Sequence, residues 1–181
     1  MQTLNYKENV VVVHAGKHWQ SKTFPKAWWE EMVNQFKEAG FKVCLIGHKV
    51  DENVGYVEIS GDGCIDLRDK LSIPEFIYLL KNCKYLFSND SSPIHAASAG
   101  DAFVGVVATC KHPDFILHWR KGQFGWNSKN FGLDGVWNHI DYSPAQTSTI
   151  TAEELPEGLM EAILPNQKDV AQYYANLRDS K

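Results

Sequence analysis

Short apolar runs alternate with segments of helical periodicity along the first 110 residues, and few folds accommodate this pattern. Asn9–His14, Phe41–Ile46 and Phe103–Ala108 are rich in Val, Ile and Phe and have the length of strands buried on both faces. Between the first two runs, the segment from Pro25 to Gly40 carries apolar residues three and four positions apart, as an amphipathic helix does. The alternation predicts an α/β protein with a Rossmann-like, mostly parallel sheet and helices on both faces.

The same reasoning predicts further elements. Ser72-Ile-Pro-Glu75 has the spacing of a capping box, in which serine and glutamate satisfy free amides at a helix start, and this helix is expected to end near Cys83. Residues 109–143 are rich in Gly, Asn and Trp, which predicts long loops. The remaining expected elements are strands at Val54–Ile59, Tyr85–Phe87 and Val136–Ile140, and helices at Ile94–Ala99, Thr151–Leu164 and from Gln167 onward.

Length and composition limit the class of protein. A chain of 181 residues, 44% hydrophobic and 22% charged, predicts one globular domain over residues 1–181. Its net charge of −4 gives no support for nucleic acid as a partner. The apolar runs are far shorter than the ~20 residues that span a bilayer and Met1–Glu8 is too polar for a signal peptide, so we expect no transmembrane segment and a cytoplasmic location. Four cysteines without a CxxC pair are unlike a zinc or disulfide framework.

Two loops that follow predicted strands carry residues suited to binding a ligand, because open α/β sheets bind ligands at the carboxyl ends of their strands. The loop His14–Pro25 contains Gly16, which allows close backbone approach, and Lys22. The loop Ser88–His95 runs directly from a strand into a helix, whose free amides favour an anion such as phosphate.

Each of these features also has a simpler interpretation. A lysine in a loop usually faces water. Asp90 or Ser91 is equally suited to be an N-cap, which is the commoner use of such residues at a strand-to-helix turn. His95 is equally compatible with a buried, hydrogen-bonded histidine. Alone, neither loop establishes a site.

Taken together and in this order, the two loops resemble glycosyltransferase family 9, the bacterial heptosyltransferases that build lipopolysaccharide core from ADP-heptose. In that family a strand leads into a loop ending in Lys, one or two residues and Pro. A helix and a strand ending in Gly follow, and later an Asn-Asp-(Ser/Thr)-Gly-Pro-(Met/Leu)-His motif precedes an Ala-rich helix. The matching residues here are Ser21-Lys-Thr-Phe-Pro25, Leu45-Ile-Gly47 and Asn89-Asp-Ser-Ser-Pro-Ile-His95. The resemblance covers about residues 9–110 and leaves 111–181 as a loop-rich segment with C-terminal helices.

This resemblance implies one half of a GT-B fold, the carboxy-terminal half that binds a nucleotide-diphosphate sugar such as ADP-heptose. The implied activity is inverting, metal-independent sugar transfer to a glycan or lipid-linked acceptor held by a separate N-terminal domain. We expect no cofactor and no metal, because a fixed cation and helix amides can stabilise the pyrophosphate leaving group. The sequence contains no Asp-x-Asp metal motif.

The resemblance also assigns the site residue by residue. Ser92 stands where the family has glycine, so a side chain occupies a position of close approach to phosphate. No general base is assigned, because in the family that residue lies in the N-terminal domain. The expected catalytic residues are Lys22, Asp90 and His95, and the expected donor-binding residues are Gly16, Ser21, Lys22, Asp90, Ser91, Ser92 and His95. Apart from the resemblance, Asp51 or Glu52 is expected to bind the ribose hydroxyls, because an acidic residue after the second strand commonly does so in nucleotide-binding sheets.

Two other functions fit the same residues. One is a non-catalytic module that binds a nucleotide or nucleotide-sugar, which the missing acceptor domain favours. The other is an epimerase or hydrolase acting on nucleotide-sugars, since such sheets host both, although no extra acid/base pair supports it. Trp119, Trp126 and Trp137 lie in the loop-rich segment, where an exposed aromatic ring can stack on a base or sugar.

Overall fold

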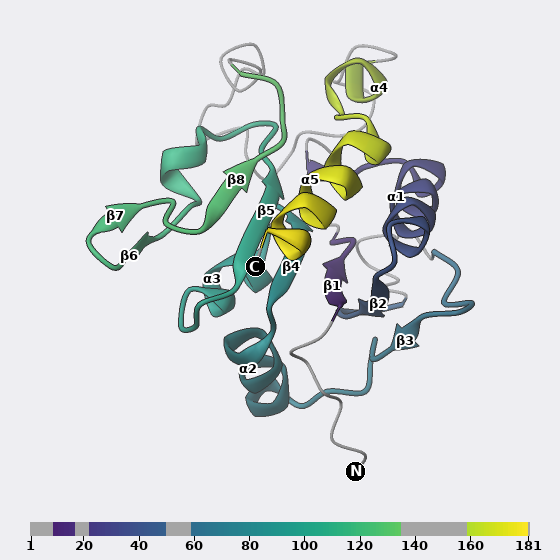
Figure 1. Cartoon of the computed structure of the whole chain (residues 1–181), viewed down its shortest axis with the longest axis horizontal. Helices are drawn as coiled ribbons and strands as arrows, with labels where there is room; N and C mark the ends of the chain where they lie inside the picture. Colours follow the sequence, from purple (N-terminus) through teal and green to yellow (C-terminus); the bar gives the residue numbers. More distant parts are fainter. Residues whose placement is uncertain (1–8, 17–21, 50–58, 135–158, 181) are drawn as a thin grey trace, which may run out of the picture.

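One parallel sheet of six strands organises the computed structural model, which describes residues 9–16, 22–49, 59–134 and 159–180 (Figure 1). Its order is β3-β2-β1-β4-β5-β8, and every neighbouring pair is parallel. The α/β class with a Rossmann-like sheet is therefore confirmed. The strands are β1 (Val10–His14), β2 (Lys42–Leu45), β3 (Ile65–Asp66), β4 (Tyr85–Asn89), β5 (Phe103–Val107) and β8 (Ser128–Asn130).

Helices cover both faces of the sheet, as predicted. The helices α1 (Lys26–Glu38) and α5 (Gln167–Asp179) lie side by side on one face, and Figure 1 shows α5 crossing in front of β4 and β5. The shorter helices α2 (Ile73–Asn82) and α3 (Ser92–Ala97) pack on the other face. Neither the 13-residue helices α1 and α5 nor any other described helix has the length and apolarity of a bilayer-spanning segment.

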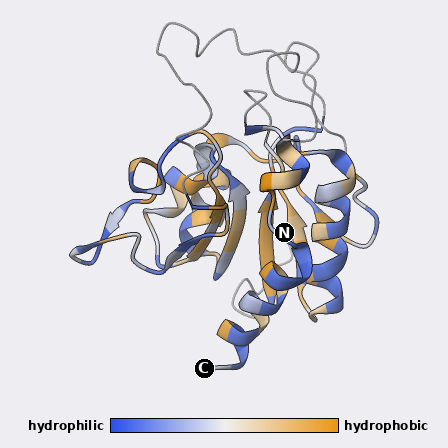
Figure 2. Ribbon diagram, turned by 90° about the horizontal axis from the view of Figure 1, so that it is seen from above, coloured by the Kyte–Doolittle hydropathy of each residue, from blue (hydrophilic) through white to orange (hydrophobic). Residues whose placement is uncertain are grey.

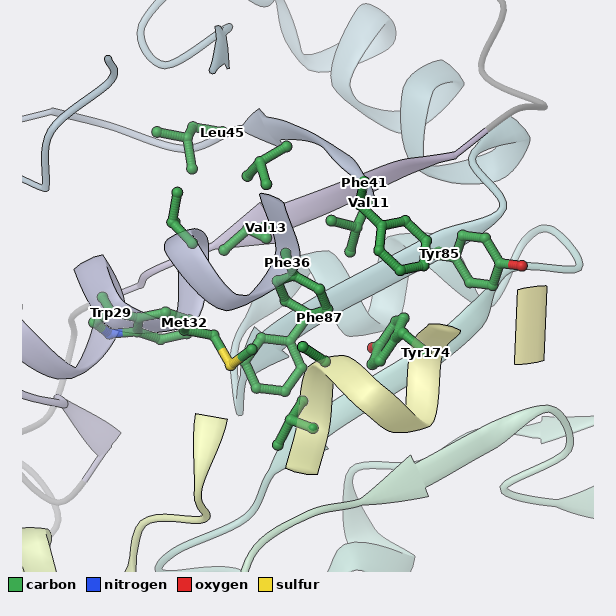
Figure 3. Close-up of a cluster of buried hydrophobic side chains, with 14 of the residues drawn as sticks. Val11, Val13, Trp29, Met32, Phe36, Phe41, Leu45, Tyr85, Phe87 and Tyr174 are labelled. Atoms are coloured by element: carbon green, nitrogen blue, oxygen red, sulfur yellow. The ribbon is translucent and has the colours of Figure 1, made fainter. Parts of the chain in front are cut away.

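The face beneath α1 and α5 is filled by aromatic rings, and we call it the aromatic face (Figure 3). Alternation along the strands sends Val11, Val13, Tyr85 and Phe87 to this side. Tyr174 of α5 lies at its centre and packs edge to face against rings from α1 and from the strands. The rings buried here belong to Phe24, Trp29, Phe36, Phe41, Tyr85, Phe87, Phe103 and Tyr174.

The opposite face, beneath α2 and α3, is built from smaller side chains, and we call it the aliphatic face. Its buried members are Val, Ile, Leu, Ala and Cys, among them Val12 of β1, Leu80 of α2 and Ala97 of α3. Figure 2 shows the strands as a mainly hydrophobic layer flanked by helices with hydrophilic outer surfaces. Strands apolar on both faces are typical of a parallel sheet covered by helices on each side.

Several predicted boundaries differ from the structure. The third strand is β3 at Ile65–Asp66, whereas the predicted strand at Val54–Ile59 falls mostly outside the described residues and its last residue, Ile59, is buried in a loop. The third helix begins at Ser92 and not at Ile94, because Pro93 occupies its first turn. On α2, Leu79 and Leu80 are buried, whereas Ile77 is exposed because its side of the helix faces outward from the sheet.

The segment after β5 is more ordered than the loops predicted for it. It contains a 3-10 helix at Pro113–Phe115, an antiparallel hairpin of β6 (Trp119–Arg120) and β7 (Gln123–Phe124), and the edge strand β8. The predicted strand Val136–Ile140 and the start of the predicted helix Thr151–Leu164 lie outside the described residues. Helix α4 (Leu159–Ile163) agrees with the end of the predicted helix Thr151–Leu164. A single domain over residues 1–181 stays a prediction.

Candidate functional site

The central strands β1 and β4 are neighbours, and the chain leaves them in opposite directions. After β1 it passes through α1 to β2, and after β4 it passes through α3 to β5 on the other side. The two loops therefore diverge at the carboxyl edge of the sheet and leave a crevice, which is where open α/β sheets bind ligands. A cavity of about 730 Å³ lies there, on the side of α2 and α3.

An ion pair joins the two loops that the sequence singled out. Lys22 follows β1, Asp90 follows β4, and Lys22 Nζ lies 2.5 Å from Asp90 Oδ2. The side chains are only 11% and 6% exposed, so both charges have lost most of their hydration. The attraction between them compensates for this loss. Both residues line the cavity.

Asn89 explains why these loops meet. Asn89 is the last residue of β4, is buried, and donates from Nδ2 to the backbone oxygens of Gly16 at 2.6 Å and Lys22 at 2.7 Å. One buried amide thus ties the chain after β1 to the end of β4. Its two hydrogen bonds hold the backbone of Lys22 close to Asp90.

The floor of the cavity carries a buried histidine that the sequence analysis did not single out. His14 ends β1, and its Nδ1 lies 3.4 Å from the hydroxyls of both Ser88 and Ser91. Burial lowers the pKa of His14 to about 4, so the ring is neutral near neutral pH. A Cβ on Gly47, whose φ is +102°, would lie 2.8 Å from this ring, so that position requires glycine.

Two further histidines, His95 and His48, line the cavity. Nδ1 of His95, on α3, lies 2.7 Å from Nε2 of His118, which immediately precedes β6. Partial burial lowers the pKa of His118, and the charges of His95 and Arg120 lower it further. His48, after β2, pairs with Asp69 at 2.6 Å, and the Lys49 amide and the His48 ring hold the pKa of Asp69 below its usual range.

The structure brings most of the predicted site residues together. Six of them line the one cavity, and they come from the two loops identified in the sequence: Gly16, Lys22, Asp90, Ser91, Ser92 and His95. Ser21, Asp51 and Glu52 lie outside the described residues, so their placement stays a prediction. Within the described part of the chain, no three His, Cys, Asp or Glu side chains are arranged to hold a metal ion.

Other residues that line the cavity were not predicted from the sequence as part of the site. His14 and Asn89 end strands β1 and β4, and the final residue of a central parallel strand is a signal that could have identified them. Lys111, Phe115 and Ile116 come from the segment after β5 and enter the cavity wall through tertiary packing. Trp119 is exposed on the β6–β7 hairpin, whereas the ring of Trp126 packs against Lys121 and Arg120.

A doubly wound sheet with a cavity at its switch point, lined by a buried lysine and several histidines, defines a Rossmann-like domain suited to a phosphate-containing ligand. Residues 2–110 match the family described as glycosyltransferase family 9 (heptosyltransferase). This match spans more than half of the chain, and the chain belongs to that family.

Relatives and solved structures agree with this assignment. Lipooligosaccharide heptosyltransferase 2 of Haemophilus ducreyi is 29% identical over 85 residues, which are 44% of this chain and 24% of that protein. The family 9 glycosyl transferase of Veillonella parvula superposes with a TM-score of 0.64 and 13% identity over 97% of this chain and 47% of its own. Escherichia coli ADP-heptose lipopolysaccharide heptosyltransferase II superposes with a TM-score of 0.56 and 16% identity over 95% of this chain and 47% of its own.

These comparisons establish the fold as one half of a GT-B fold. The chain spans about half the length of the solved structures it matches and about a quarter of the curated relative. The part that the family model matches ends at residue 110, so the cavity wall formed by Lys111, Phe115 and Ile116 lies beyond it.

Proposed function

We propose that this chain is the donor-binding half of an inverting, metal-independent glycosyltransferase, and that its cavity holds a nucleotide-diphosphate sugar. The observation that carries the proposal is the buried Lys22–Asp90 pair, which is formed between the loops after β1 and β4 and lines the switch-point cavity. ADP-heptose is the donor named for the Escherichia coli relative, and we propose the same class of donor here.

The charges of the cavity suit a nucleotide diphosphate. Lys22 and Lys111 supply cations, and His48 and His95 supply ring nitrogens that can donate hydrogen bonds. Departure of a nucleoside diphosphate leaves negative charge on the phosphate oxygens, and a cation already held in place stabilises this charge without reorganisation. Lys22 is assigned this role because Asp90 and Asn89 hold it in position.

Asp90 has a different role in this proposal. An ionised carboxylate only accepts hydrogen bonds and repels phosphate, so it is suited to sugar hydroxyls and to orienting Lys22. Ser91 and Ser92 place hydroxyls on the same wall. Helix α3 has six residues, and we therefore assign the phosphates to the side chains of the cavity more than to the helix start.

The first test is thermal stabilisation of the chain by ADP, GDP, UDP and CDP and by their sugars, because a ligand that binds only the folded state raises its melting temperature. A selective shift with one base supports the donor site and identifies the nucleotide. A folded chain that none of the panel stabilises would contradict the proposal.

The second test concerns Lys22. Lys22→Met alone leaves the buried charge of Asp90 uncompensated, so the informative variant is Lys22→Met with Asp90→Asn, which removes both charges. We expect this double variant to fold and to lose about a hundredfold in affinity for the preferred nucleotide diphosphate, the value of a charge-assisted contact. Lys26→Met, an exposed lysine on the neighbouring helix, is the matched control. Unchanged affinity in the double variant would remove Lys22 from the site.

Sugar transfer is tested by adding a separately produced acceptor domain of a family member to the chain. Transfer supports the enzyme, whereas donor binding without transfer favours a non-catalytic binding module.

We expect the reaction to take place in the cytoplasm, and the four cysteines, all unpaired, support this location.

A further inference from the structure

The contact between His95 and His118 joins the cavity to a segment outside the family match. His95 lies on α3 within residues 2–110, whereas His118 lies eight residues past the end of that match. Their ring centroids are 4.6 Å apart and the ring planes are inclined by 41°. At 2.7 Å, the Nδ1 to Nε2 distance is that of a hydrogen bond, which requires one nitrogen to donate and the other to accept.

Arg120 fixes the position of His118. Its buried guanidinium donates to the backbone oxygens of Gly100 at 2.9 Å, Ala102 at 3.1 Å and Trp126 at 2.8 Å. These bonds anchor the start of the β6–β7 hairpin to the chain between α3 and β5. His118 is two residues from this anchor, so its ring has a defined place beside α3.

The electrostatic surroundings differ for the two rings. His118 is partly buried and lies close to the positive charge of Arg120, and both effects lower its pKa and favour its neutral form. His95 lines the cavity together with Lys22 and Lys111, whose positive charges attract an anion to it. Among the described residues, Nε2 of His95 has no hydrogen-bond partner, so this nitrogen is available to a ligand.

We propose that His118 is a positioning residue for His95: with an anion in the cavity, Nδ1–H of His95 donates to the neutral Nε2 of His118, and Nε2–H of His95 donates to the anion. A protonated imidazole donates from both nitrogens, so a neighbour opposite Nδ1 must accept. The extra proton on His95 comes from solvent. This inference rests on the proposed function, because it requires an anionic ligand.

The experiment uses inorganic pyrophosphate as the probe and compares the wild-type chain with His118→Leu and His118→Gln. Leucine fills similar space without an acceptor, whereas glutamine places an amide oxygen near the position of Nε2. We expect leucine to weaken pyrophosphate binding about tenfold, the lower end of the range for a charge-assisted hydrogen bond, because the lost bond holds His95 and does not itself contact the anion. Glutamine should restore affinity to within about twofold. His112→Asn lies in the same segment outside the cavity lining and keeps an acceptor for the Asp114 amide, so it serves as the control.

Nitrogen NMR of the imidazole rings supplies a readout that a structural role would not change. In the wild-type complex, both nitrogens of His95 should carry protons while Nε2 of His118 carries none. Equal pyrophosphate affinity in wild type and His118→Leu, or a protonated Nε2 on His118, would overturn this inference alone. If the wild-type chain binds a nucleotide diphosphate but no pyrophosphate, this inference fails and the proposed function stands. If it binds neither, both fail.

Discussion

On the aromatic face, rings from α1, α5 and the strands contact one another at centroid separations of 5.0–6.5 Å around Tyr174. The buried residues of the aliphatic face have no aromatic rings among those described, and the helices there have 10 and 6 residues where α1 and α5 each have 13. The cavity opens beside the aliphatic face, where α2 and α3 supply part of its wall.

This difference separates stability from ligand binding within one domain. Large rings bury much apolar area and leave little space, so each ring on the aromatic face contributes strongly to stability. Small residues on α3 allow its backbone to approach the sheet, and its short length leaves space for a cavity. A change on the aromatic face should therefore alter stability far more than ligand binding, and a change in the cavity wall beside the aliphatic face should alter ligand binding more.

The largest expected effect is on the aromatic face. Phe36→Ala removes a fully buried ring that packs against Phe41, Phe87 and Tyr174. We expect a loss of about 3–5 kcal/mol in the free energy of unfolding, measured by chemical denaturation. Ile77→Ala, on the exposed side of α2, is the control and should change it by less than about 0.5 kcal/mol. If Phe36→Ala lowers the free energy of unfolding no more than the control does, the role of the aromatic face in stability is contradicted.

The next largest effect concerns the pH dependence of the free energy of unfolding, to which the buried His14 contributes. Its folded-state pKa of about 4 lies below the ordinary value of 6.5, so the unfolded chain binds more protons between these values. Stability should therefore fall as the pH falls from 6.5 to 4, by about 3 kcal/mol from this residue.

Denaturation at several pH values measures this slope, and His14→Leu should abolish most of it. The exposed variant His112→Asn is the control and should retain it. Asp66 has a pKa well below its usual range because of hydrogen bonds from Arg68, so its loss of stabilisation begins at lower pH. An unchanged slope in His14→Leu would show that the ring is not buried in its neutral form.

A smaller effect is expected from the hydroxyl at the centre of the aromatic face. Tyr174 donates from its hydroxyl to the Leu86 backbone oxygen at 2.6 Å. Tyr174→Phe keeps the ring and removes this hydrogen bond, which should lower the free energy of unfolding by about 1 kcal/mol. Tyr173→Phe on the same helix is partly exposed and should have almost no effect. Equal losses in the two variants would show that the buried hydroxyl adds nothing beyond the ring.

The smallest expected effect tests the proposed metal independence of the cavity. Dialysis of the chain against a chelator should leave its affinity for a nucleotide diphosphate unchanged, because Lys22 and the histidines are proposed to balance the phosphate charge. Isothermal calorimetry before and after dialysis measures this. If dialysis abolishes the affinity and a divalent cation restores it, the phosphates are bound by a metal ion and not by Lys22.

Much of the fold could be predicted because the signals are local. Gly40, with φ of +84°, ends α1, and Ser72 with Glu75 forms the predicted capping box of α2. Strands β3 and β8 were missed because strands of two and three residues have no measurable periodicity. They exist through pairing with β2 and β5, which no local pattern reports.

The sequence by itself determined the alternating elements, the parallel sheet and the two loops that carry Lys22 and Asp90, because helix spacing, strand length and turn residues are properties of neighbouring positions. Tertiary structure alone decided that Asn89 would tie these loops together, that His14 would be neutral, and that His118 would reach His95 from beyond the family match. Distances, burial and pKa values arise between residues far apart in the chain, and they take values only when the sheet has brought those residues together.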